Sequence, residues 1–129
     1  MTIAETSVGT PLQCSIAAAE GDRVRAELLM LYSGTRYLDI ALLDAGGGIA
    51  LYAASGTASP LAEGAPELYP SPSFSKSASA WLFTIAAGHI AAGHATVVLA
   101  QQGTGTGTVY AHTTYPWRMR LYNLGPEPT

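Results

Sequence analysis

The chain has 129 residues, 48% of them hydrophobic, which suits one domain with a hydrophobic core and is too short for two ordinary domains. Its net charge of −3 includes only six Lys and Arg residues, so it lacks the basic surface that nucleic-acid binding needs. Charged residues make up 12%, about half of the fraction typical of soluble domains. Such a surface is typical of a secreted or filament-borne β-domain, or of a subunit that neighbouring molecules partly cover.

Residues 1–11 are predicted to form an N-terminal arm. They lack the basic region and apolar stretch of a signal peptide, and no segment of the chain is apolar enough to span a bilayer. We therefore expect a protein that is made in the cytoplasm and located in a virion or another extracellular particle. Cys14 is the single cysteine, so it forms no intrachain disulfide and is expected to be a small buried residue.

The first half of the chain alternates between apolar and other residues, as β-strands do. Strands are predicted over residues 12–18, 24–32, 38–42 and 49–53, with turns at Gly-containing stretches between them. The stretch 24–32 (VRAELLMLY) is also rich in good helix formers, so a helix is the alternative there. We prefer a strand because its even positions are apolar and would face the core, which leaves Arg25 and Glu27 facing outward.

Residues 55–79 contain four prolines and are predicted to form one long irregular loop. Further strands are expected over residues 81–85, 95–100, 108–112 and 115–122, followed by a C-terminal tail at 123–129. About eight strands in one domain, residues 12–122, predict an all-β fold, namely a single β-sandwich or jelly-roll-like domain. Trp81 and Trp117 are assigned to its core.

The phrase AAGHIAAGHA at residues 86–95 contains two of the three histidines. His89 and His94 are five positions apart, which places them on different faces of either a helix or a strand. No zinc-binding or H-E-x-x-H spacing is present, and His112 has no sequence signal that brings it near. We therefore interpret the phrase as a connection between two strands and predict no metal, no cofactor and no catalytic residue. Asp39 and Asp44 are interpreted as exposed hairpin residues rather than as a catalytic carboxylate pair.

Three stretches carry a resemblance to a known group: YLDIALLDAGGGIALYAAS, WLFTIAAGHIAAGHATVVL and GTGTGTVYAHTT. In them a strand with an acidic residue (Asp39) leads to a glycine turn, and an apolar strand later meets the Ala92-Gly93 turn. This pattern resembles secreted bacterial β-sandwich modules such as the pre-peptidase C-terminal domain, over roughly residues 20–113. The resemblance implies a jelly-roll-like sandwich with an accessory role, and it implies no catalytic residue. In overall character the chain also resembles capsid decoration proteins of tailed phages.

Tyrosine and arginine are enriched in protein interfaces, and both occur in the predicted last strand. We expect the interface candidates to be Tyr115, Arg118, Arg120, Tyr122, Leu68, Tyr69, Phe74 and Ile3. They predict a non-enzymatic structural subunit that decorates or cements a larger assembly such as a capsid or filament, with copies of itself as further partners. A glycan-binding or adhesion module is the first alternative, since exposed tyrosines also stack on sugars. A small enzyme is the second, and it requires a histidine to converge with a carboxylate.

Overall fold

The computed structural model describes residues 2–7, 13–34, 37–53, 71–102, 107–110 and 118–128, with side chains described for residues 13–29, 39–53, 80–100 and 118–128. These parts contain nine β-strands and one short 3₁₀ helix, η1 (Ala87–His89). The described part has no helix long and apolar enough to cross a membrane. The prediction of an all-β domain is confirmed.

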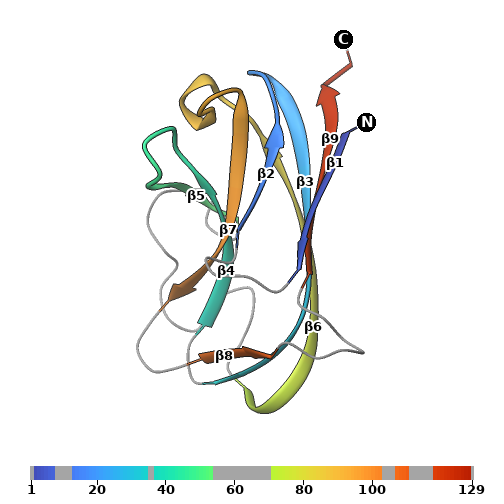
Figure 1. Cartoon of the computed structure of the whole chain (residues 1–129), viewed down its shortest axis with the longest axis vertical. Helices are drawn as coiled ribbons and strands as arrows, with labels where there is room; N and C mark the ends of the chain where they lie inside the picture. Colours follow the sequence, from blue (N-terminus) through green and yellow to red (C-terminus); the bar gives the residue numbers. More distant parts are fainter. Residues whose placement is uncertain are drawn as a thin grey trace.

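The strands form two antiparallel sheets that face each other (Figure 1). The five-stranded sheet has the order β1 (Thr2–Ser7), β9 (Arg118–Pro126), β3 (Asp22–Gly34) and β6 (Ser71–Thr84), and β8 (Gly107–Tyr110) pairs with the end of β3. The four-stranded sheet has the order β2 (Gln13–Ala17), β7 (His94–Gln102), β4 (Tyr37–Leu43) and β5 (Ile49–Tyr52). With β8 set aside, this interleaved order is that of a jelly roll.

The core lies between the sheets and is filled by the alternating residues that the sequence marks as apolar. The fully buried side chains with the largest volumes are Ile16, Ile40, Leu42, Ile85, Met119, Leu121, Val24 and Val97. Cys14 is buried among them as expected. Trp81 is partly buried and packs against the same cluster, which agrees with its assignment to the core, whereas Trp117 lies outside the described residues.

The stretch with two predicted conformations is a strand. Residues 24–32 belong to β3, which pairs with β9 on one side and with β6 on the other. Val24, Ala26 and Leu28 are buried, while Arg25 and Leu29 are exposed. Pairing on both edges and burial of one face decide the conformation here, because they outweigh the weak intrinsic preference for helix.

Three predicted segments differ from the structure by more than two residues. The arm at residues 1–11 includes a full strand, β1, which pairs with β9 from Thr2 opposite Asn123 to Ser7 opposite Arg118. Residues 71–79 of the predicted loop 55–79 belong to β6, because β3 supplies them with a hydrogen-bonding partner. The predicted tail at 123–129 begins inside β9, which continues to Pro126. Residues 55–70 lie outside the described residues.

A polar cluster fixes one end of the five-stranded sheet. Asn123 donates from Nδ2 to the Asp22 Oδ2 atom at 2.8 Å and to the carbonyl of Ala17 at 2.9 Å. The backbone N–H of Ala19 donates to the same Asp22 oxygen at 2.9 Å. The bond from Asn123 and, second, the bond from Ala19 lower the pKa of Asp22, because both favour its charged form. The cluster thereby joins the β2–β3 turn to β9.

Candidate functional site

The repeated Ala-Ala-Gly-His phrase forms two consecutive turns. The first contains η1, where the backbone N–H of Ala86 donates to the Nδ1 atom of His89 at 3.0 Å. The second is a hairpin turn closed by two backbone bonds between Ala91 and His94 (2.9 and 3.0 Å). Its central residues, Ala92 and Gly93, have φ values of +49° and +78°, as in a type I′ turn. This agrees with the interpretation of the phrase as a connection between strands.

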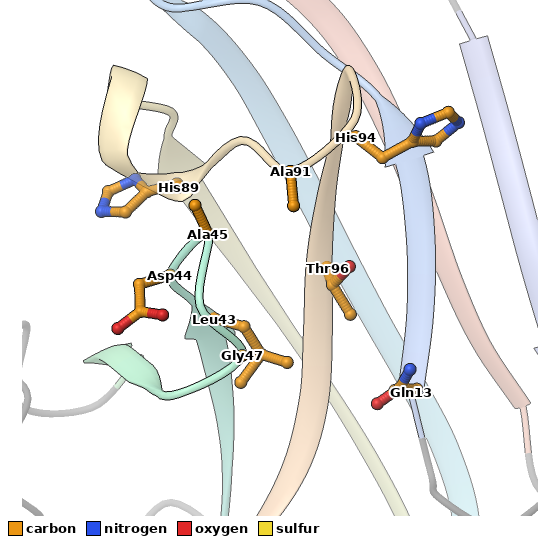
Figure 2. Close-up of a pocket in the computed structure, with 9 residues that line it drawn as sticks. All are labelled: Gln13, Leu43, Asp44, Ala45, Gly47, His89, Ala91, His94 and Thr96. Carbon is orange, nitrogen blue, oxygen red and sulfur yellow. The ribbon is translucent and has the colours of Figure 1, made fainter.

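Both histidines line a shallow pocket of about 300 Å³ at the end of the four-stranded sheet. Figure 2 shows their imidazole rings pointing away from each other, with His94 directed away from Asp44 as well. Within the described part of the chain, no three His, Cys, Asp or Glu side chains lie close enough together to hold a metal ion. His112 lies outside the described residues. The described side chains therefore form no metal-ligand set.

Asp44 stabilises the β4–β5 turn in which it lies. Its Oδ1 atom accepts hydrogen bonds from the backbone N–H groups of Gly46 (2.8 Å) and Gly48 (3.0 Å). A Cβ atom on either glycine would lie 3.2–3.3 Å from this carboxylate, so a larger residue at either position would require the Asp44 side chain to shift. The prediction of an exposed hairpin residue is confirmed for Asp44.

The same prediction is wrong for Asp39. Its side chain is fully buried, and its Oδ1 atom accepts a hydrogen bond from the backbone N–H of Ile40 at 2.8 Å. Ala41, two residues further along β4, is buried in a second apolar cluster with Tyr52 and Ala100. Both faces of β4 are thus covered at this point, so alternation alone gave the wrong exposure for Asp39.

The outer face of the five-stranded sheet is different, because it is exposed and brings several predicted interface residues together. Met119 and Leu121 point into the core, so Arg118, Arg120 and Tyr122 lie on the outer face. Their register partners on β3 are Leu29, Glu27 and Arg25. On the other side of β9, Ile3 of β1 is the register partner of Tyr122. We call this surface, from β9 across β3 to the outward residues of β6, the β9–β3–β6 face.

All three large hydrophobic residues that are exposed in the described part of the chain belong to this face. Leu82 on β6 is 56% exposed, and Leu29 on β3 and Leu124 on β9 are each 40% exposed. Leu82 pairs with Arg25, and Leu29 pairs with Arg118. Scattered exposed leucines are ordinary, but their concentration on one face among Arg and Tyr residues is typical of interaction surfaces.

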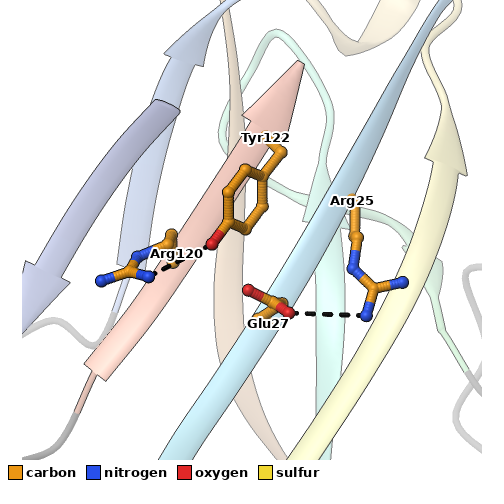
Figure 3. Close-up of polar contacts among 4 residues, drawn as sticks. All are labelled: Arg25, Glu27, Arg120 and Tyr122. Atoms are coloured by element: carbon orange, nitrogen blue, oxygen red, sulfur yellow. Dashed lines mark hydrogen bonds and ion pairs between the residues drawn. The ribbon is translucent and has the colours of Figure 1, made fainter. Parts of the chain in front are cut away.

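The polar groups of the face bond along its strands. Figure 3 shows Arg120 donating to the Tyr122 hydroxyl at 3.2 Å on β9, and Arg25 paired with Glu27 at 3.4 Å on β3. The side chains of Arg25 and Glu27 are 49% and 39% exposed, so this ion pair contributes little to stability.

Arginines are concentrated on this face although the chain is acidic. Four of the six Lys and Arg residues lie on it, namely Arg23, Arg25, Arg118 and Arg120, against Glu27 as the one acidic residue among its described side chains. Arginine forms bidentate bonds with carboxylates and also stacks on aromatic rings, so it suits recognition of an acidic partner.

For four of the predicted interface residues, the structure describes no side chain on this face. Tyr115, Leu68 and Tyr69 lie outside the described residues, and only the backbone of Phe74 in β6 is described. The exposed leucines and Arg25 were not predicted as interface residues. Their signal was present in the sequence, since Leu29 and Leu82 occupy the outward phase of strands whose inward phase was already assigned.

No protein-family model, no curated protein sequence and no solved structure matches this chain.

Proposed function

We propose that this protein is a non-enzymatic structural subunit that docks onto a larger assembly, such as a phage capsid, through the β9–β3–β6 face. The observation that carries the proposal is the placement of all three exposed leucines of the described chain on this face, beside Arg118, Arg120 and Tyr122. Burial of such a surface is the dominant favourable contribution in most protein association. Jelly rolls are also the fold of many viral capsid domains, which supports the proposal by analogy.

The size of the face indicates how a partner would sit on it. Three to four strands at a spacing of about 4.8 Å, and about six residues at 3.3 Å, span roughly 15–20 Å by 20 Å. A standard interface removes about 800 Å² from each partner, so the face supplies of the order of half of it. Further contacts would come from β1 and from neighbouring surface, in line with the expected role of the N-terminal segment and of additional copies of the chain.

Site-specific photo-crosslinking tests the proposal. A benzoylphenylalanine is placed at Leu82 on the face or, as control, at Gln13, an exposed residue of the other sheet. Irradiation in the producing cells is expected to join position 82, and not position 13, to one repeated protein of a high-mass particle. Equal cross-linking from both positions, or none from position 82, would overturn the proposal.

Glycan binding is the second candidate, and the Tyr122 ring beside Arg120 on an exposed sheet face is the observation that favours it. An oligosaccharide array distinguishes the two. A subunit that only docks on a particle gives no array signal, whereas a glycan-binding module gives a signal that Tyr122→Ala removes.

A further inference from the structure

A second pocket lies at the edge of the β9–β3–β6 face. It has a volume of about 220 Å³ and opens between β5 and β6, the outermost strands of the two sheets. On the opposite side of the sandwich, β2 lies against β1 and β9. The pocket is lined by Leu51, Tyr52, Ala53, Trp81, Leu82, Phe83 and Thr84. This lining is mainly apolar and aromatic, and none of its described residues is charged.

The pocket is the right size for one apolar side chain. An apolar cavity of about 150 Å³ holds a benzene molecule, so 220 Å³ accommodates a phenylalanine-sized group. Pockets that receive a single aromatic or aliphatic anchor dominate the binding energy of many interfaces. Leu82 belongs both to this pocket and to the exposed face, so the two surfaces are continuous.

Arginines stand next to the pocket on the neighbouring strand. In the β3–β6 register, Arg25 pairs with Leu82 and Arg23 pairs with Thr84, the two exposed residues of the lining. Adjacent strands are about 4.8 Å apart, which places Arg25 within reach of a ligand seated in the pocket. The Arg23 Nε atom donates to the Gly125 carbonyl on β9 at 3.3 Å, which holds this guanidinium group on the side of β3 away from the pocket. Arg25 is therefore the arginine that a ligand in the pocket meets.

We propose that this pocket and Arg25 bind an acidic protein segment that inserts one apolar side chain, with an aromatic ring as the best fit, between β5 and β6. The anchor contacts Trp81 and Phe83, and a carboxylate next to it in the partner pairs with Arg25 in place of the exposed Glu27. This inference rests on the proposed docking function and names the chemistry of the partner. Charge complementarity selects the acidic partner, because Arg25 borders the pocket and no acidic side chain occurs among the described lining residues. The ion pair between Arg25 and Glu27 is exposed and therefore weak, so a carboxylate of the partner can replace it.

An NMR titration of the ¹⁵N-labelled full chain with a synthetic peptide tests the inference. The probe is the acetylated amide Glu-Asp-Glu-Phe-Asp-Glu-Gly. We expect shifts of amide signals at residues 51–53 and 81–84, which weaken between about 50 and about 300 mM NaCl as charges are screened. Replacing Phe with Ser in the peptide is expected to weaken binding at least about fivefold.

Matched protein variants separate the pocket from the charge. Arg25→Gln is expected to weaken binding about threefold, whereas Gln13→Glu, which changes the net charge equally on the other sheet, leaves it unchanged. Thr84→Trp fills the pocket and removes binding, and Gln13→Trp does not. Equal binding of the Phe-free peptide, equal binding of a lysine-substituted peptide or of a DNA duplex, or no effect of Arg25→Gln would overturn the inference.

The result is distinguishable from failure of the docking function itself. If the peptide does not bind in this way while position 82 still cross-links to a particle protein, the assigned partner chemistry is wrong and docking stands. If both experiments fail, the face is not a docking surface.

Discussion

The hairpin turn before β7 contains a non-glycine residue whose backbone conformation lowers the stability of the fold. Ala92 has φ of +49° and is the one described non-glycine residue with positive φ. A left-handed conformation costs an L-residue with a Cβ atom about 1–2 kcal/mol, and glycine avoids this cost. Glycine also gives the unfolded chain more freedom, which offsets about 0.4–1 kcal/mol. We therefore expect Ala92→Gly to raise the free energy of unfolding by about 0.5–1 kcal/mol.

Thermal unfolding followed by circular dichroism measures this gain. For a domain of this length, about 1 kcal/mol corresponds to a shift in Tm of about 4 °C, so Ala92→Gly should raise Tm by about 2–4 °C. Ala92→Asn should also raise Tm, because asparagine tolerates this conformation and Asn-Gly is the preferred type I′ pair.

Two neighbouring substitutions serve as controls with the opposite sign. Ala91→Gly lies in the same turn without positive φ, so it should lower Tm through unfolded-state entropy alone. Gly93→Ala should lower Tm as well, although no atom lies within 4 Å of the added Cβ, because φ at Gly93 is +78°. Equal shifts for Ala91→Gly and Ala92→Gly would refute the reasoning, since backbone conformation would then not decide the effect.

Three further predictions concern the polar cluster, the core and the β4–β5 turn. Because the folded state lowers the pKa of Asp22, the charged form of Asp22 stabilises the fold above about pH 4, and this contribution is lost as pH falls through the lowered pKa. The difference in urea stability between wild type and Asp22→Asn should therefore be present at neutral pH and disappear in acid. A difference that stays constant with pH would contradict this prediction. Leu121→Ala should lower the free energy of unfolding in urea by about 2–5 kcal/mol, because the Leu121 side chain is fully buried. Leu82→Ala on the exposed face should lower it by under about 1 kcal/mol. Similar costs for the two variants would contradict the assignment of Leu121 to the core. Asp44→Ala removes the acceptor of two backbone N–H groups and should lower the free energy of unfolding by about 1–2 kcal/mol. Asp44→Asn is the matched control and should cost less, because its Oδ1 atom can still accept these bonds.

The sequence by itself determined most strands and which of their residues face inward. Alternation is a local property, since successive side chains of any strand point to opposite faces. It therefore placed Val24 and Leu121 in the core and Arg118, Arg120 and Tyr122 outside before any pairing was known. Residues 71–79 also have a period of two, since serine occupies every odd position, but apolar residues do not alternate regularly with it, so the sequence predicted a loop there.

Only the tertiary structure decided which strands are neighbours and which outward faces stay exposed. β1 pairs with β9 although almost the whole chain separates them, and no local pattern encodes that pairing. Asp39 and Arg25 both occupy the outward phase of their strands, yet Asp39 is fully buried and Arg25 is exposed. The physical reason is that exposure depends on what covers a sheet from outside, which long-range contacts determine and which the period of a single strand does not contain.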